Sequence, residues 1–455
     1  MVESDESKKR KFYRLSPLGR LEVLSASGVL SDVDISVLAQ ANECGILSPD
    51  AASHLIENQI SQYALPMGVV RGLRVNGRDY TVPMVVEEAS VVAAASHGAH
   101  MSAVCGGVVA HTQESRVRGE VVYAAHDVSY DKLKQVVVSC EAELRAIARK
   151  ALPSMHARGG GLEALFVEKT PDNRFVKTVL VVNPCDAMGA NAVNTIAEAI
   201  SHTLESPEYF GIKPLVAILS NAGNDSVTTA HVELTPQAVA FRGASRVESE
   251  KLVKRIALLS DLAVSDYDRA VTHNKGIMNG ISSAVLASGN DTRAVESCAH
   301  AYAGRGQSYM PLTRWYVNDA GNLCGHIEVP LQVGIVGGAA SSIPLAGVAR
   351  RMGHYENVAE FKNVLAALGL VQNLSALRAL AGPGIQAGHM NLQMNALAIA
   401  AGAQGDDIDV VASLLRKLKP AERTSARAAQ FVEQINSKRQ METEHKHREN
   451  QGEGN

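Results

Sequence analysis

The chain has 455 residues, 46% of them hydrophobic and 20% charged, which suits two or three domains with a large buried core. Its net charge of −3 is too near neutral to indicate a nucleic-acid or membrane surface, although a small anionic ligand is compatible with it. The first residues, MVESDESKKRKFYRLS, lack the apolar core of a signal peptide, and no apolar run approaches the roughly 18–20 residues of a membrane span. Six scattered cysteines without a CxxC pair indicate reduced, intracellular thiols, and no His or Cys spacing predicts a metal site.

The first 60 residues predict short helices with clear start signals. Ser16-Pro17 and Ser48-Pro49 each combine an N-cap residue with proline at the first helical position, and Ser31 begins a capping box. NGRD at 76–79 predicts a hairpin turn between LRV and YTVPMVV. The alanine-rich segment EEASVVAAASHGAHMSAV then predicts a tightly packed helix.

Residues 116–221 alternate between strand and helix patterns. RVRGEVVYAA, LEALFVEK, FVKTVLVVN and KPLVAILSN predict strands, whereas DKLKQVVVSCEAELRAIARK and ANAVNTIAEAISHTLE predict helices. This order is β-α-β-β-α-β, the ferredoxin-like split-βαβ pattern. The sequence therefore predicts an α+β fold in which a large, mostly helical domain (1–112 and 223–385) is interrupted by a small domain at 113–222.

After the inserted domain, the pattern returns to helices. ESEKLVKRIALLSDLAV and DTRAVESCAHAYA predict helices, TRWYVNDAGNLCGHIEVP predicts a hairpin, and residues 355–382 predict one or two more helices. GPGIQAGHM interrupts this pattern, so the helix-rich segment 386–440 is expected to form a mobile C-terminal flap. The charged residues 441–455 are predicted to be disordered.

Lys275 lies in THNKGIMNGISSAVLASGND (272–291), among small and polar residues. The ordinary interpretation is a surface lysine in a turn, and local composition alone leaves that interpretation open. The alternative is a cation directed at a developing oxyanion. Gly276 and Gly280 would then let a substrate approach the backbone, and Asp291 would hold the ammonium and keep it charged.

Three further segments could carry chemistry. Glu87 and Glu88 precede a helix, where they either complement its dipole or supply a partly buried proton donor. His389, in GIQAGHM, either caps a helix or acts as a general acid on a mobile flap. DAMGAN (186–191) opens a helix after a strand, where free N–H groups can bind phosphate. It is not GxGxxG, and an N-cap aspartate explains Asp186 almost as well.

Taken together, these segments resemble one enzyme family. THNKGIMNGISSAVLASGNDTRAVESCAHAYA, DAMGANAVNTIAEA, VPMVVEEASVVAAAS and GIQAGHMNL are similar to the signature segments of 3-hydroxy-3-methylglutaryl-coenzyme A (HMG-CoA) reductase, in its short class II form without a membrane anchor. The resemblance extends from about residue 12 to residue 435. It implies a four-electron reduction of the HMG-CoA thioester to mevalonate and coenzyme A with two nicotinamide hydrides.

The resemblance also implies a role for individual residues. Lys275 would stabilise the oxyanion formed at each carbonyl, and Asp291 would hydrogen-bond and orient Lys275. Glu88 would supply a proton as the aldehyde becomes an alcohol. His389 would protonate the departing thiolate, since a thiol with a pKa of roughly 8.5 leaves reluctantly. The implied substrate contacts are Ser90, Arg269, Asn279, Gln372 and Arg14, and the implied cofactor contacts are Asp186, Met188, Gly189, Asn191 and Asn221.

The chain departs from the family pattern in two places. ENQIS (57–61) replaces ENVIG, so the packing of that loop and its coenzyme A contact are in question. In ARKALPSMHARGGG, Ala151 and Leu152 stand where members that use NADH carry an acidic residue, which would repel a 2′-phosphate. Arg149 and Lys150 could receive that phosphate, so NADPH is favoured over NADH.

The expectation is therefore a cytoplasmic enzyme of the mevalonate pathway, at least a homodimer with active sites at the subunit interface. No metal, nucleic acid or membrane partner is expected. Two alternatives remain open. The same enzyme could oxidise mevalonate in a catabolic pathway, because the residues serve both directions. A non-catalytic paralogue that binds coenzyme A or a nucleotide is disfavoured, because it would not need Glu88, Lys275, Asp291 and His389 together.

Overall fold

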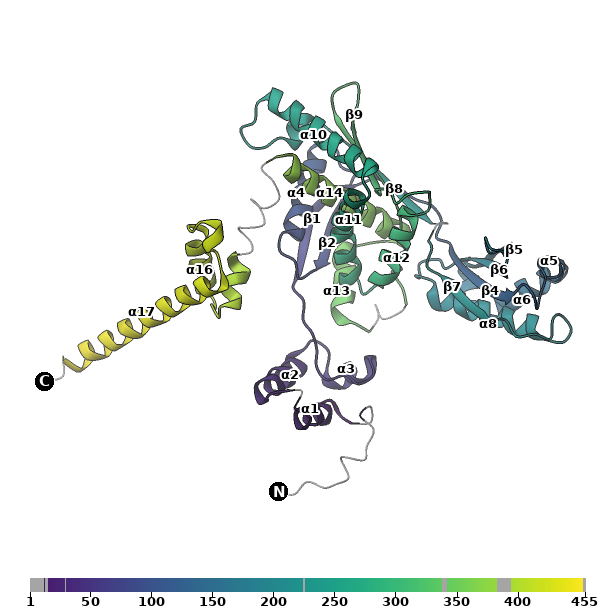
Figure 1. The fold of residues 1–455 in the computed structure, drawn as a ribbon, viewed down its shortest axis with the longest axis horizontal. Helices are drawn as coiled ribbons and strands as arrows, with labels where there is room; N and C mark the ends of the chain where they lie inside the picture. The colour runs from purple at the N-terminus through teal and green to yellow at the C-terminus, as the bar shows by residue number, and fades with distance from the viewer. Residues whose placement is uncertain are drawn as a thin grey trace, which may run out of the picture.

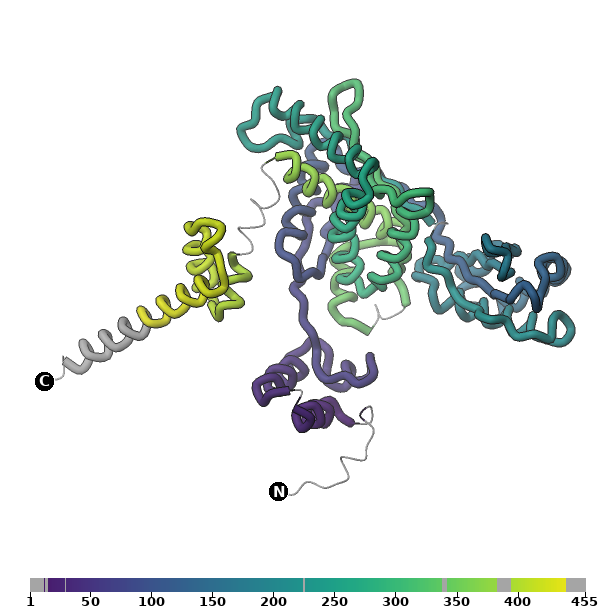
Figure 2. Tube along the Cα trace, viewed as in Figure 1, coloured from purple at the N-terminus to yellow at the C-terminus, as the bar shows by residue number. Residues whose placement is uncertain are grey.

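The computed structural model describes residues 12, 15–28, 30–223, 226–337, 342–382 and 394–452, with side chains as far as residue 438. Two of the predicted site residues, Arg14 and His389, lie outside these ranges. The inserted domain projects from one side of the large domain, and the N-terminal and C-terminal helices form separate groups (Figure 1). The continuous trace enters and leaves the inserted domain at the same face of the large domain (Figure 2).

The large domain is organised around one long helix, α14 (Val358–Ala381). An antiparallel sheet in the order β3-β8-β10-β9 lies against α14, and helices α4 and α11 pack on its other sides. Among the described helices α14 is the one long and apolar enough to cross a membrane, but 72% of its apolar window is buried. In this fold it is the core helix. The sheet strands are β3 (Val109–Thr112), β8 (Val227–Leu234), β9 (Thr313–Val317) and β10 (Leu323–Pro330).

A hairpin and several helices complete the large domain. The predicted turn joins the hairpin strands, with Asn76 and Gly77 both at positive φ, 51° and 81°, as a type I′ turn requires. The NDAGN turn likewise joins β9 to β10, as predicted. The remaining elements are β1 (Met67–Val75), β2 (Arg78–Val85), α4 (Val91–Val104), α9 (Pro236–Val239), α10 (Arg246–Ser265), α11 (Tyr267–Ala287), α12 (Thr292–Ala303) and α13 (Pro344–Gly353).

The inserted domain has its own sheet and its own apolar core. Its strands follow the antiparallel order β5-β6-β4-β7, and its elements succeed one another in the β-α-β-β-α-β order that the sequence predicted. The first predicted helix is broken at Cys140, and a third short helix follows it. The elements are β4 (Val117–Ala124), α5 (Tyr130–Ser139), α6 (Glu141–Ala151), α7 (Pro153–Ala157), β5 (Gly161–Lys169), β6 (Phe175–Asn183), α8 (Ala190–Glu205) and β7 (Val216–Ser220).

Lys362, on α14, forms hydrogen bonds with both chain segments that connect the large domain to the inserted domain. Its ammonium is almost fully buried and donates to Ser115 Oγ at 2.8 Å and to Ser226 Oγ at 3.0 Å. Ser115 precedes β4 and Ser226 precedes β8, so each connection contributes one hydroxyl. Burial lowers the pKa of Lys362 to about 8, although Cys298 opposes this shift.

This burial predicts a specific dependence of stability on pH. Because the pKa of Lys362 is about 8 when folded and 10.5 ordinarily, the unfolded chain binds more protons between these values. Stability should therefore rise with pH from 8 to 10.5, by about 1.4 kcal/mol per unit from this group. Urea unfolding at pH 8 and pH 10 should show this rise in the wild type and lose it in Lys362→Met. An equal rise in both proteins would contradict the assignment.

The N-terminal helices begin where the sequence predicted. Ser16, Ser31 and Ser48 each accept a hydrogen bond from a backbone N–H of the following helix, and Ser31 forms a full capping box. These hydrogen bonds satisfy N–H groups that a helix start leaves without partners. The helices are α1 (Pro17–Ala26), α2 (Asp32–Cys44) and α3 (Pro49–Leu55).

The ENQIS loop is tied to α2 by the residues that depart from the family pattern. Gln59 is buried, and its amide donates to Asn42 Oδ1 and to the carbonyl oxygen of Ser61, both at 2.9 Å. Ser61 Oγ donates to the carbonyl oxygen of Leu38 at 2.7 Å. The substituted residues therefore supply new hydrogen bonds, and the loop packs without the glycine.

The C-terminal helices form a small core of their own, which includes Val411, Leu415 and Ala428. Its elements are α16 (Asp407–Arg416), the short η4 (Pro420–Glu422) and α17 (Ser425–Gly452). The backbone of α17 stays helical into the segment 441–455, for which the sequence analysis predicted disorder. Acidic and basic residues at four-residue spacing in METEHKHREN favour a helical backbone in this segment.

Candidate active site

Lys275 lies in the middle of α11, not in the turn suggested by its glycine-rich surroundings. The residue before it anchors the helix, because Asn274 is fully buried, donates to the carbonyl oxygen of Met310 and accepts from the N–H of Leu312. Gly280 does not open the backbone to a substrate. It packs against Gln372, where a Cβ would lie 3.0 Å from that side chain.

His273 provides a second buried anchor for α11. Thr313 Oγ1 donates to Asn373 Oδ1 at 2.9 Å, so the same oxygen must accept the bond from His273 Nε2. The histidine therefore carries its proton on Nε2. Trp315 Nε1 donates to the same Asn373 oxygen at 2.8 Å. Burial, together with a smaller effect of the nearby charge of Arg269, lowers the pKa of His273 to about 3, so the imidazole is neutral.

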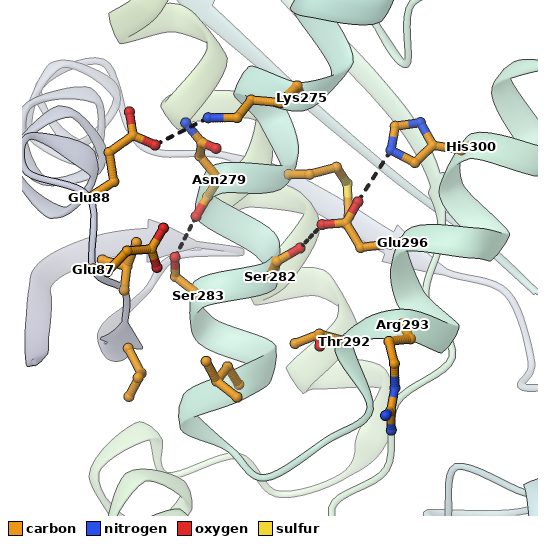
Figure 3. Close-up of a pocket in the computed structure, with 14 residues that line it drawn as sticks. Glu87, Glu88, Lys275, Asn279, Ser282, Ser283, Thr292, Arg293, Glu296 and His300 are labelled. Atoms are coloured by element: carbon orange, nitrogen blue, oxygen red, sulfur yellow. Dashed lines mark hydrogen bonds and ion pairs between the residues drawn. The ribbon is translucent and has the colours of Figure 1, made fainter. Parts of the chain in front are cut away.

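The Lys275 ammonium forms an ion pair with Glu88, with 3.1 Å between Nζ and Oε2. The two side chains point toward one another from α11 and from the loop after β2 (Figure 3). They line a cavity of about 580 Å³ together with Asn279, a predicted substrate contact. The other lining residues are Val85, Val86, Glu87, Met278, Ser282, Ser283, Leu286, Thr292, Arg293, Glu296 and His300.

Ser90, two residues after Glu88, has a strained backbone. Its φ is 79°, in the left-handed region, where a residue with a side chain costs roughly 1–2 kcal/mol. Ser90 directly precedes α4, whose packing against β1 and α14 holds it in this conformation. Strain of this kind persists where surrounding structure fixes the backbone, often at a functional site.

Glu296 and His300, on α12, form a polar wall of the cavity that the sequence analysis missed. Ser282 donates to Glu296, His300 Nε2 lies 3.2 Å from the other carboxylate oxygen, and His300 Nδ1 lies 2.6 Å from the Tyr309 hydroxyl. Burial acts to raise the pKa of Glu296, but the hydrogen bonds from His300 and Ser282 hold it below its ordinary value. The four-residue spacing of Glu296 and His300 on a predicted helix was the available signal.

Asp291 does not contact Lys275 in the part of the chain that the structure describes. It is the N-cap of α12, where its carboxylate accepts from the N–H groups of Arg293 and Ala294 at 2.9 and 3.3 Å. It also pairs with the Arg293 guanidinium at 3.1 Å, and this bond is the main reason that the pKa of Asp291 is lowered. Arg293 lies at the far end of the cavity from Lys275 (Figure 3).

A second cavity, of about 560 Å³, adjoins the first and shares Leu286 and Arg293 with it. One wall is the start of α8 and the loop before it, and the other comes from the turn between α11 and α12 and from Val336, Gly337 and Ile343. The predicted cofactor contacts Met188, Gly189 and Asn191 line it, together with Ala187, Ala190, Ala192, Gly289, Asn290, Asp291, Val336, Gly337 and Ile343.

Asp186 is not the helix N-cap that one interpretation of DAMGAN made it. It does not cap α8, whose N-cap is Gly189, and it does not line the second cavity. Its carboxylate accepts a 2.9 Å hydrogen bond from the N–H of Val358, the first residue of α14. Asp186 therefore ties the inserted domain to the core helix.

The remaining predicted residues lie outside the two cavity linings. Gln372 is buried behind Gly280, and Arg269 is half-buried in the first turn of α11, where burial lowers its pKa. Gln372 Oε1 and Arg269 Nε have no hydrogen-bond partner among the described residues, so both retain polar capacity. Asn221, Arg149 and Lys150 are exposed in the inserted domain and are not part of either lining.

Comparisons with known proteins identify the family of this chain. The profile of the family described as hydroxymethylglutaryl-coenzyme A reductase matches residues 19–394. A 3-hydroxy-3-methylglutaryl-coenzyme A reductase of Archaeoglobus fulgidus is 38% identical over 408 residues, which cover 89% of each chain. A probable reductase of the same name from Borreliella burgdorferi is 34% identical, over 76% of this chain and 78% of its own.

Solved structures give the same result. The class II reductase of Streptococcus pneumoniae, bound to NADPH in open conformations, aligns with a TM-score of 0.70 and 34% identity, over 92% of this chain and 99% of its own. A second structure of the Streptococcus pneumoniae enzyme aligns with a TM-score of 0.71 and 32% identity, over 95% and 100%. The chain therefore belongs to the hydroxymethylglutaryl-coenzyme A reductase family, which comprises NAD(P)H-dependent oxidoreductases of the mevalonate pathway, and it is of the class II type.

Proposed function

We propose that the chain reduces (S)-HMG-CoA to (R)-mevalonate and coenzyme A, a four-electron reaction that uses two molecules of NAD(P)H. The observation that carries this proposal is the Lys275–Glu88 ion pair, 3.1 Å long, in a cavity that shares lining residues with the second cavity at the start of α8. Substrate would occupy the first cavity and the nicotinamide cofactor the second. Binding the two ligands in adjoining cavities would bring the thioester carbonyl and the hydride donor together.

Lys275 and Glu88 supply complementary chemistry. A hydride that reaches a carbonyl carbon leaves negative charge on the oxygen, and the Lys275 ammonium stabilises that charge. Glu88, in its protonated form, would donate a proton when the aldehyde becomes an alcohol. Lys275 donates a hydrogen bond to Glu88, so both groups would face the same substrate oxygen. His389 protonates the departing thiolate, a role that rests on the GIQAGHM resemblance alone.

Asp291 would orient Lys275 after a change of partner. In the described structure it binds Arg293, whose side chain is 90% exposed. An exposed ion pair of this kind contributes about 1 kcal/mol or less, so exchanging Arg293 for Lys275 costs little. We propose that ligand binding or subunit association drives this exchange.

The residues around the second cavity fit a nicotinamide dinucleotide. Gly189 has a φ of 101°, and a Cβ there would lie 2.9 Å from Pro184, so only glycine fits at the start of α8. The first N–H groups of α8 have no side-chain cap and can bind a phosphate. When bound, each cofactor molecule would supply one hydride, so two molecules are used in turn.

The preference for NADPH can be tested at Ala151. Ala151→Asp should lower kcat/KM with NADPH by roughly tenfold or more, because a carboxylate there would repel the 2′-phosphate. The value with NADH should stay the same or rise, and initial rates at 340 nm measure both. Ala142→Asp, an exposed position at the other end of α6, adds the same charge and should change neither value. Equal losses with both cofactors would count against this site.

The first test of the activity is the stoichiometry of the reaction. Purified protein with HMG-CoA and NADPH should oxidise two cofactors, followed at 340 nm, for each thiol released. A folded protein without turnover with either NADPH or NADH would exclude the reductase assignment. We further propose a cytoplasmic homodimer or larger homo-oligomer with interface active sites, which light scattering of the purified protein would test.

A further inference from the structure

A short contact between the two domains, here called the interdomain seam, fixes the position of the second cavity relative to the first. It consists of residues 186–188 of the inserted domain against 334–336 of the large domain, joined by a 2.9 Å backbone hydrogen bond and a parallel β-bridge. The contact is close, because a Cβ on Gly334 would lie 2.4 Å from the backbone nitrogen of Met188. The loop that lines the second cavity therefore rests directly on the backbone of the large domain.

Asn290 fastens the large-domain side of the seam. It lies in the turn between α11 and α12, one residue before Asp291, and lines the second cavity. Its Nδ2 donates to the carbonyl oxygen of Gly334 at 3.0 Å, and the N–H of Gly334 donates to its Oδ1 at 2.8 Å. The Asn290 amide therefore pairs with both the N–H and the carbonyl oxygen of Gly334, as the backbone of a neighbouring β-strand would. This pairing links the helix that carries Lys275 to the seam.

We propose that Asn290 is a positioning residue for hydride transfer. This inference rests on the proposed function, because it takes the first cavity as the substrate site and the second as the cofactor site. The path from α11 through Asn290 and Gly334 to Met188 is short and made of direct contacts. It fixes the separation between Lys275 and the loop at Met188. A misplacement of about 1 Å between reacting groups can cost on the order of a hundredfold in rate.

The test is the kinetic behaviour of Asn290→Ala. We expect kcat to fall by roughly ten- to a hundredfold, with the KM for HMG-CoA changed less than about twofold. The kinetic isotope effect on kcat with cofactor deuterated at the transferred position should increase, because hydride transfer becomes slower than the other steps. Gly334→Ala should reproduce both changes without altering Asn290, since its Cβ pushes Met188 away from the seam.

Asn76 provides a matched control. Its amide makes the same two-bond pairing with the backbone of Ala110, at 2.9 Å for each bond, but wholly inside the large domain. Asn76→Ala should lower the Tm and leave kcat and the isotope effect unchanged. The proposal is overturned if Asn290→Ala also lowers only the Tm. Wild-type protein without reductase turnover would instead overturn the proposed function, and this inference with it.

Discussion

Replacing Lys275 with methionine should lower kcat by about a thousandfold. In the proposed mechanism the ammonium is the cation that faces the reacting oxygen, and loss of one preorganised donor to an oxyanion costs roughly a hundred- to a thousandfold. The same cation would act in both proposed reduction steps, so the upper end of that range is expected. Initial rates at 340 nm measure kcat, and calorimetric titration with HMG-CoA measures binding, which should weaken far less than kcat falls.

Folding should not obscure this result. The Lys275 side chain is 63% exposed, and methionine retains its length and its helix propensity, so the Tm should stay close to the wild-type value. Lys254→Met, on the exposed surface of α10, controls for the loss of one charge. A Lys275→Met protein that keeps more than about a tenth of the wild-type kcat would show that another group stabilises the oxyanion.

Acid should destabilise the large domain through His273. Its pKa is about 3 when folded and 6.5 ordinarily, so the unfolded chain binds one more proton between these values. The stability from this group is complete above pH 6.5 and falls by about 1.4 kcal/mol per unit as the pH drops toward 3. From pH 7 to pH 5 it should contribute a loss of about 2 kcal/mol, which is large beside a typical total of 5–15 kcal/mol.

The single tryptophan makes this measurement direct. Trp315 is fully buried in the hydrogen-bond network of His273, so its fluorescence in urea reports unfolding of the large domain. His273→Gln keeps a donor for Thr313 but cannot titrate, and it should lose about 2 kcal/mol less than the wild type between pH 7 and pH 5. His126→Gln, at an exposed position, should behave as the wild type. Identical pH dependence in all three proteins would rule out His273.

Helix caps and hairpin turns that depend on a few neighbouring residues were predicted correctly from the sequence. The caps at Ser16, Ser31 and Ser48 and the Asn76-Gly77 turn follow from two to four neighbouring residues, and each is present. The alternation across residues 116–221 likewise predicted the inserted domain. The helix around Lys275 was not predicted, because contacts with distant residues stabilise it. Its glycines weaken local helix propensity, and buried side chains such as Asn274 hold it in place.

The site followed from the sequence only through the family resemblance. No local pattern brings Glu88 to Lys275, which is 187 residues away, or Asp186 to Val358, which is 172 residues away. The sequence also does not decide which cation pairs with Asp291, because Arg293, two residues along the chain, competes with Lys275 for it. Contacts of this kind depend on packing between elements that a single sequence does not position.

The inserted domain has a consequence for how this architecture can arise. The strands that lead into and out of it, β3 and β8, are hydrogen-bonded neighbours, with Thr112 directly opposite Thr228. Paired strands lie roughly 5 Å apart, a gap that a hairpin loop of two to five residues spans. Topologically, the whole inserted domain is thus an enlarged loop of a β-hairpin. A gene could gain or lose it at this point without breaking the sheet beneath, and a short turn in its place would leave a continuous large domain.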